Sequence, residues 1–119
     1  MGRKALVALS LCLLTLGLTA FVAADEGHKE PTQVTATCSS TSALVSWAAV
    51  QDGHLSGYDV YRKVSSETEY TLANPALVTT TSYTVTGLSS GLAYDFAAIA
   101  VYNDGHTSAL SESARCTTS

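Results

Sequence analysis

The feature that most constrains the fold is a two-residue alternation of apolar and polar side chains, which recurs from Thr32 to the end of the chain. In segment 94–102, for example, Tyr94, Phe96 and Ala98 fall on one side of an extended chain. Successive side chains of a β-strand point to opposite faces, so this alternation is typical of strands with one buried and one solvated face. Turn-forming Gly, Ser, Asn and Asp separate the alternating segments, and no segment shows the apolar periodicity of a helix. The sequence therefore predicts an all-β sandwich.

Seven segments are expected to form strands. The region between residues 65 and 81 contains only a short edge strand, because Asn74-Pro75 interrupts it and proline cannot donate a hydrogen bond to a β-ladder. The predicted strands are 32–38, 43–48, 57–63, 70–72, 82–86, 94–102 and 111–117. The side chains expected in the core are Trp47, Tyr58, Val60, Leu88, Tyr94 and Phe96.

Residues 1–24 differ in composition from the rest. Arg3 and Lys4 precede an uncharged, apolar stretch that ends in Val22-Ala23-Ala24, after which the chain becomes polar and charged. This order is typical of a secretory signal peptide cleaved after Ala24. An uncleaved membrane anchor is the alternative, since about 20 apolar residues can span a bilayer. We therefore divide the chain into a signal peptide (1–24), a short acidic tail (25–30) and one domain (31–119).

The charge of the mature chain limits its partners. Loss of Arg3 and Lys4 leaves four basic residues against ten acidic ones, a net charge of −6. Proteins that bind nucleic acids need clustered Lys and Arg, so nucleic acid is not an expected partner. No further apolar run reaches membrane length, so no membrane span is expected after cleavage.

Cleavage also leaves two cysteines, Cys38 and Cys116. An even pair in an exported chain is typical of a disulfide. Metal ligation or a catalytic thiol is the alternative, but the sequence has no CxxC spacing.

Several short motifs resemble those of one known family. They are Pro31, Ser46-Trp47, Gly57-Tyr58-Asp59-Val60-Tyr61-Arg62, and the run Tyr83-Thr84-Val85-Thr86-Gly87-Leu88 followed by Gly91 and Tyr94. In this order and spacing they resemble a fibronectin type III domain from about residue 31 to residue 119.

The resemblance implies an immunoglobulin-like β-sandwich of seven strands with fibronectin type III topology. Leu88, Gly91 and Tyr94 resemble the tyrosine corner, in which the hydroxyl bonds back to the backbone of a turn. In the family's topology the first and last strands end at the same pole, which would bring Cys38 close to Cys116. An immunoglobulin domain would instead bridge its second and sixth strands, and these contain no cysteine here.

Catalysis is not expected. Gly87-Leu88-Ser89-Ser90-Gly91 matches G-x-S-x-G, but that motif works at a strand-to-helix turn of a large α/β sheet, and here it lies between two predicted strands. The sequence offers no cofactor motif and no convergent acid–base pair.

The tripeptide Asp-Gly-His occurs twice, as Asp52-Gly53-His54 and Asp104-Gly105-His106. The resemblance places both in loops at one pole, where two imidazoles and two carboxylates could hold zinc or a similar ion. Ordinary turn chemistry is the competing interpretation, because Asp-Gly is a common turn dipeptide.

Two surfaces are candidates for binding. One is the loop pole, with His54 and His106, because loops on a rigid scaffold often carry recognition. The other is the outward face of the third and sixth strands, where we expect an exposed apolar patch. Its residues are Tyr61, Ala97, Ile99 and Val101.

The resemblance implies a secreted, non-enzymatic binding module that contacts an extracellular protein or carbohydrate. A structural spacer or assembly subunit without a ligand of its own is the alternative. No cofactor is expected.

Overall fold

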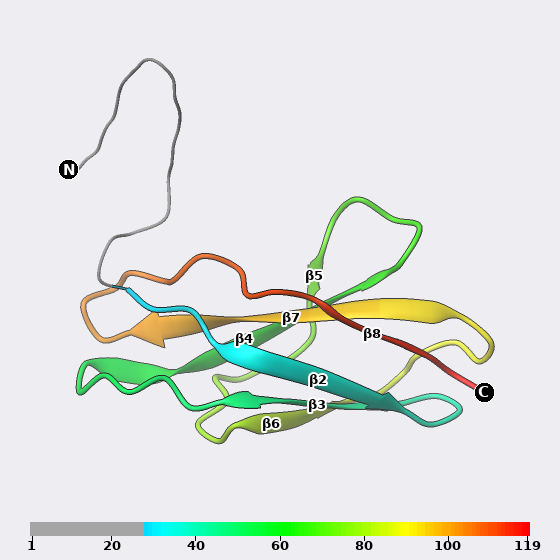
Figure 1. Ribbon diagram of the computed structural model, residues 1–119, viewed down its shortest axis with the longest axis horizontal. Coiled ribbons are helices and arrows are strands. Elements are labelled where there is room, and N and C mark those ends of the chain that lie inside the picture. Colours follow the sequence, from blue (N-terminus) through cyan, green and yellow to red (C-terminus); the bar gives the residue numbers. More distant parts are fainter. Residues whose placement is uncertain (1–27) are drawn as a thin grey trace, which may run out of the picture.

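The computed structural model describes residues 28–119, which form a sandwich of two antiparallel sheets (Figure 1). The strands are β2 (Thr32–Cys38), β3 (Ala43–Ala48), β4 (Leu55–Val64), β5 (Thr71–Leu72), β6 (Ser82–Val85), β7 (Ala93–Tyr102) and β8 (Ala114–Thr117). One sheet has the order β2-β3-β6 and the other the order β5-β4-β7-β8. The predicted seven-stranded sandwich is thus confirmed, and the described residues contain no helix.

The core lies between the two sheets. Val45 and Trp47 reach it from β3, while Val60 and Phe96 reach it from β4 and β7, and all four are buried. The β4–β7 ladder is the longest, running from Leu55 opposite Tyr102 to Val64 opposite Tyr94. The six side chains predicted for the core are all buried: Trp47, Tyr58, Val60, Leu88, Tyr94 and Phe96.

The last strand begins at Ala114 and not at residue 111, as the sequence had suggested. Just before it, two serines bond to β7 through backbone and side chain together: their N–H groups donate to the Ala100 and Ala98 carbonyls, and the Ser108 and Ser111 hydroxyls accept from the Ala100 and Ala98 amides, each at 2.9 Å. Because these hydroxyls give the β7 amides their hydrogen-bond partners, a regular ladder is not needed at this point of the β7 edge.

Asn74 has a similar role beside β4. Its buried amide oxygen accepts from the Val60 N–H at 2.7 Å, and its Nδ2 donates to Asp59 Oδ1 at 2.9 Å and to the Ala76 carbonyl at 2.8 Å. The break expected at Asn74-Pro75 is therefore a place where a side chain continues the hydrogen bonding of the sheet edge.

The tyrosine corner is present at the turn between β6 and β7. The Tyr94 hydroxyl accepts a hydrogen bond from the Ser89 N–H at 2.9 Å, and the ring is buried. Gly87 and Gly91 have φ values of 74° and 78°, which residues with a β-carbon rarely adopt. Ser89 thus lies in a turn between strands, where the nucleophile-elbow geometry is absent.

The Cys38–Cys116 disulfide is confirmed. It joins β2 of one sheet to β8 of the other, with a Cα–Cα distance of 5.7 Å and a sequence separation of 78. The adjacent chain end is tied to the same place, since the Ser119 N–H donates to the Ser39 carbonyl at 3.3 Å. Disulfides persist in oxidising compartments, so the bond is compatible with an extracellular domain.

The predicted signal peptide and its cleavage point after Ala24 lie outside the described residues. Within residues 28–119, no helix is long and apolar enough to cross a membrane.

We expect removal of the disulfide to lower the free energy of unfolding by about 2–4 kcal/mol, because the cross-link restricts a long loop of the unfolded chain. The measurement is urea denaturation of the wild type and of the Cys38→Ser/Cys116→Ser double variant, with and without reductant. Reductant should destabilise only the wild type. Equal stabilities would contradict the expectation.

We expect Gly57→Ala to destabilise the domain by about 1–3 kcal/mol. A β-carbon there would lie 2.6 Å from the Val78 carbonyl oxygen and 2.7 Å from Leu77 Cγ. Gly53→Ala is the matched control, since nothing lies within 4 Å of its added β-carbon. Urea denaturation of both variants makes the comparison, and a loss of the same size in both would refute the steric explanation.

Candidate functional site: the loop pole

Three segments distant in sequence meet at the end of the sandwich where β7 finishes (left in Figure 1). They are the entry to β2 at residues 28–31, the β3–β4 loop and the β7–β8 loop. The two loops are joined directly, because the Asn103 N–H donates to the His54 carbonyl at 2.8 Å. We call these segments the loop pole.

The two Asp-Gly-His tripeptides adopt the same local geometry. The His54 N–H donates to Asp52 Oδ1 at 2.8 Å, and the His106 N–H donates to Asp104 Oδ1 at 2.9 Å. In each, the imidazole Nδ1 lies close to the same oxygen, at 3.3 Å in the first and 3.2 Å in the second. Both are aspartate turns of the ordinary kind.

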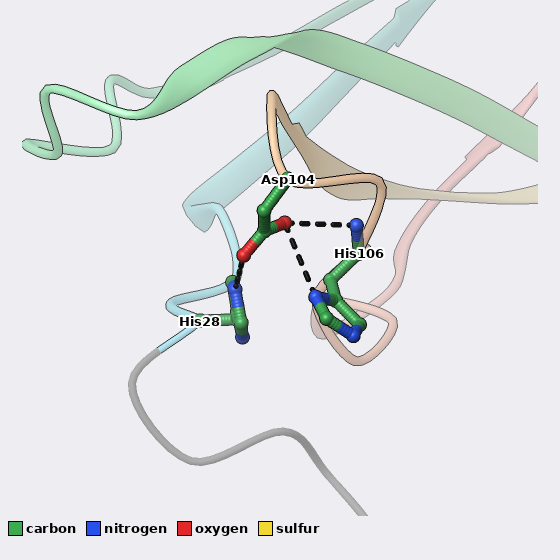
Figure 2. Close-up of side chains that lie close together, drawn as sticks. All are labelled: His28, Asp104 and His106. Atoms are coloured by element: carbon green, nitrogen blue, oxygen red, sulfur yellow. Dashed lines mark hydrogen bonds and ion pairs between the residues drawn. The ribbon is translucent and has the colours of Figure 1, made fainter.

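His28 distinguishes the second tripeptide from the first. Its Nε2 lies 3.0 Å from Asp104 Oδ2, so the Asp104 carboxylate stands between the imidazoles of His28 and His106 (Figure 2). One ligand atom from each of these three residues lies within 4.8 Å of the others. We call them the His28 cluster.

The predicted four-residue group is therefore divided. His54 and Asp52 pair with each other and are not members of the His28 cluster, and the His54 side chain is 80% exposed. Two members of the predicted group, Asp104 and His106, belong to the His28 cluster, whereas sequence reasoning missed His28, which lies in a charged tail without any motif. The signal that could have found it is topological, because the first strand begins at this pole.

Tyr102 holds His28 in place. The His28 ring packs edge-on against the buried Tyr102 ring, with 4.7 Å between centroids. The Tyr102 hydroxyl donates to the Lys29 carbonyl at 2.7 Å. These contacts attach the start of the domain to the end of β7, and the His28 side chain is only 21% exposed.

The aspartates of both tripeptides are stabilised as anions. The His106 backbone N–H, followed by the His28 imidazole, holds the pKa of Asp104 well below its ordinary value. The His54 backbone N–H lowers the pKa of Asp52 in the same way. Hydrogen bonds donated to a carboxylate favour its charged form, so both groups carry a negative charge at neutral pH.

The second predicted surface, on the outward face of β4 and β7, is not an exposed apolar patch. Ala97 is fully buried, while Tyr61, Ile99 and Val101 are only partly exposed. The expectation of joint exposure was wrong, because Ala97, opposite Tyr61 in the ladder, is fully buried although it lies on the outward face.

The same face carries a charged group that the sequence did not indicate. Asp95, with a side chain 7% exposed, contacts Arg115 Nε at 2.7 Å, Lys63 Nζ at 3.1 Å and the Ser65 hydroxyl at 2.8 Å. The Arg115 hydrogen bond is the main cause of an Asp95 pKa far below the ordinary value, with Ser65 and Lys63 contributing. We interpret this group as structural, because the buried charge of Asp95 is compensated by side chains of the same domain.

Comparison with known proteins identifies the family. The model of the family described as "Fibronectin type III domain" matches residues 29–117. A Fn3-like protein from Clostridium thermocellum is similar in structure, with 27% identity, a TM-score of 0.67, and coverage of 79% of this chain and 96% of that chain. No curated protein sequence matches this chain.

Two human structures share the fold at lower identity. Titin module A71 from cardiac muscle has 22% identity and a TM-score of 0.67, covering 75% of this chain and 89% of that chain. The fibronectin type III domain of human fibronectin type III domain containing protein 3 has 20% identity and a TM-score of 0.63, covering 81% and 90%.

We expect Asp95→Asn to lower the free energy of unfolding at pH 7 by about 2 kcal/mol, because it removes a buried charge that two cations face. The folded-state pKa of Asp95 lies below its ordinary value of 3.8, so the stabilisation is present above that pH and is lost as the pH falls further. Urea denaturation between pH 7 and pH 2 should show the two proteins converging below about pH 4.

Glu112→Gln is the control for this change, since Glu112 is an exposed carboxylate. It should leave the pH dependence close to that of the wild type. A difference between Asp95→Asn and the wild type that stays constant down to pH 2 would exclude the charge as its cause.

Proposed function

Because the chain belongs to the fibronectin type III family, whose domains are common binding or structural modules, we propose that it is a secreted, non-enzymatic binding module. Its partner is an extracellular protein or polysaccharide, contacted through the loop pole. Domains of this family are typically non-catalytic, and the turn geometry around Ser89 supports a role without catalysis.

The observation that carries the proposal is the loop pole itself. Exposed side chains such as Gln51, His54, Asn103 and His106 stand on loops whose backbones are fixed to the sandwich. The Val50 N–H, for example, donates to the buried Tyr58 hydroxyl at 2.9 Å. A recognition surface fixed before binding loses little conformational freedom when a partner arrives.

Secretion is supported by two separate features. The apolar, uncharged stretch after Arg3 and Lys4 is typical of a signal peptide. The Cys38–Cys116 disulfide is the kind of bond that lasts in an oxidising compartment.

A structural spacer is the second candidate function. One observation favours it: the aromatic residues nearest the loop pole, Tyr58 and Tyr102, are buried and use their hydroxyls within the domain. Binding hot spots are enriched in accessible aromatic side chains, and the described part of the pole exposes none of these rings.

Capture experiments with matched variants discriminate between the two. Secreted protein would be immobilised and probed with glycan arrays and with extracellular fractions. We expect a partner whose affinity falls at least about tenfold in the pole variant Gln51→Ala/His54→Ala/Asn103→Ala, because the altered side chains are exposed and lie on the binding surface. The face variant Ile99→Ala should retain it.

If binding of the partner were lost only in the face variant, the binding surface would be the outward face of β4 and β7. Failure of every probe to bind the wild type would favour the spacer.

A further inference from the structure

We propose that the His28 cluster binds one Zn²⁺ ion. The ligands are His28 Nε2, a carboxylate oxygen of Asp104 and His106 Nδ1, with one coordination position left to water or to a group from outside the domain. This site does not depend on the proposed partner, because it follows from the cluster alone.

The distances are close to those that zinc requires. Zinc binds imidazole nitrogen and carboxylate oxygen at about 2.0–2.2 Å in a tetrahedral arrangement, which places ligand atoms about 3.3 Å apart. His28 Nε2 lies 3.0 Å from Asp104 Oδ2 and His106 Nδ1 lies 3.2 Å from Asp104 Oδ1, so the two imidazoles contact different oxygens of one carboxylate. The two imidazole ligand atoms lie within 4.8 Å of each other, so small side-chain rotations would complete the triangle.

The donor set is specific for a class of metal. Two imidazoles and one carboxylate suit zinc and its transition-metal neighbours, and three protein ligands with an open position are common at zinc sites. Ca²⁺ and Mg²⁺ prefer six or more oxygen ligands, which three residues with two nitrogen donors do not provide.

The cluster is held in place without the ion. Asp104 is fixed by the His106 N–H and remains ionised, so it contributes a negative charge between the two imidazoles. Tyr102 fixes the ring of His28 and the backbone of Lys29. Little conformational freedom would therefore be lost on binding, apart from some in the His106 side chain, which is 60% exposed.

The alternative is that these contacts form only a hydrogen-bonded cluster that attaches residue 28 to the β7–β8 loop. The protein contains an internal control for the two interpretations. Asp52 and His54 reproduce the aspartate turn of Asp104 and His106, but residues 28–119 bring no third ligand to them. A zinc site built on the turn alone would treat both tripeptides equally, whereas the proposed site needs His28.

The test is calorimetric titration of ZnCl2 into the secreted chain, expressed from the full sequence without a polyhistidine tag. We expect one ion per wild-type chain. His28→Ala and His106→Ala should each weaken binding at least about tenfold, as loss of a direct ligand costs no less than loss of its supporting contacts. His54→Ala should bind as the wild type does, and MgCl2 should give no comparable heat.

Thermal unfolding supplies a second readout. Zinc should raise the unfolding temperature of the wild type and of His54→Ala, because a ligand that binds only the folded state stabilises it. It should not raise that of His28→Ala, whose substitution precedes the first strand and replaces no residue of the core cluster. Absence of zinc binding by the wild type, or unchanged affinity in His28→Ala, would overturn the proposal, as would an equal loss in His54→Ala.

Discussion

The pairing of β4 with β7 is the constraint on which the rest of the structure depends. The ladder runs unbroken from Gly57 opposite Val101 to Val64 opposite Tyr94 and supplies Val60 and Phe96 to the core. The other side of β4 is hydrogen-bonded by β5 and Asn74, and the other side of β7 by β8 and two serine hydroxyls. It also ends at the loop pole, so the same rigid element that organises the core positions the candidate site.

Three buried tyrosines of this core hold segments outside the strands in place through their hydroxyl groups. The hydroxyls of Tyr58, Tyr94 and Tyr102 reach the backbones of Val50, Ser89 and Lys29, so both poles of the sandwich are bonded to residues of the central pair of strands. A buried tyrosine needs a partner for its hydroxyl, and a loop has backbone groups that need one too. Each contact satisfies two requirements at once, which explains how a domain with few strands can hold ordered loops.

Much of the fold could be predicted because its signals are local. Alternation predicted the strands, and an even pair of cysteines in a chain expected to be exported predicted the disulfide. Ala97 shows where this reasoning ends: periodicity correctly assigns it to the outward face, but its burial there depends on tertiary packing, which periodicity does not give. Asp95 and His28 were missed for the same reason, since Arg115 and Asp104, which give them their roles, lie 20 and 76 residues away.

The two Asp-Gly-His tripeptides make the distinction between local and tertiary information concrete. Identical residues produce nearly identical turns, with the carboxylate accepting from the histidine N–H in both. What differs is the segment that topology places beside each turn. The first strand of the sandwich starts next to the β7–β8 loop, and only Asp104 therefore receives a second imidazole. The tripeptide alone supplies an aspartate turn with one carboxylate and one imidazole. The second imidazole depends on where the chain enters the sheet.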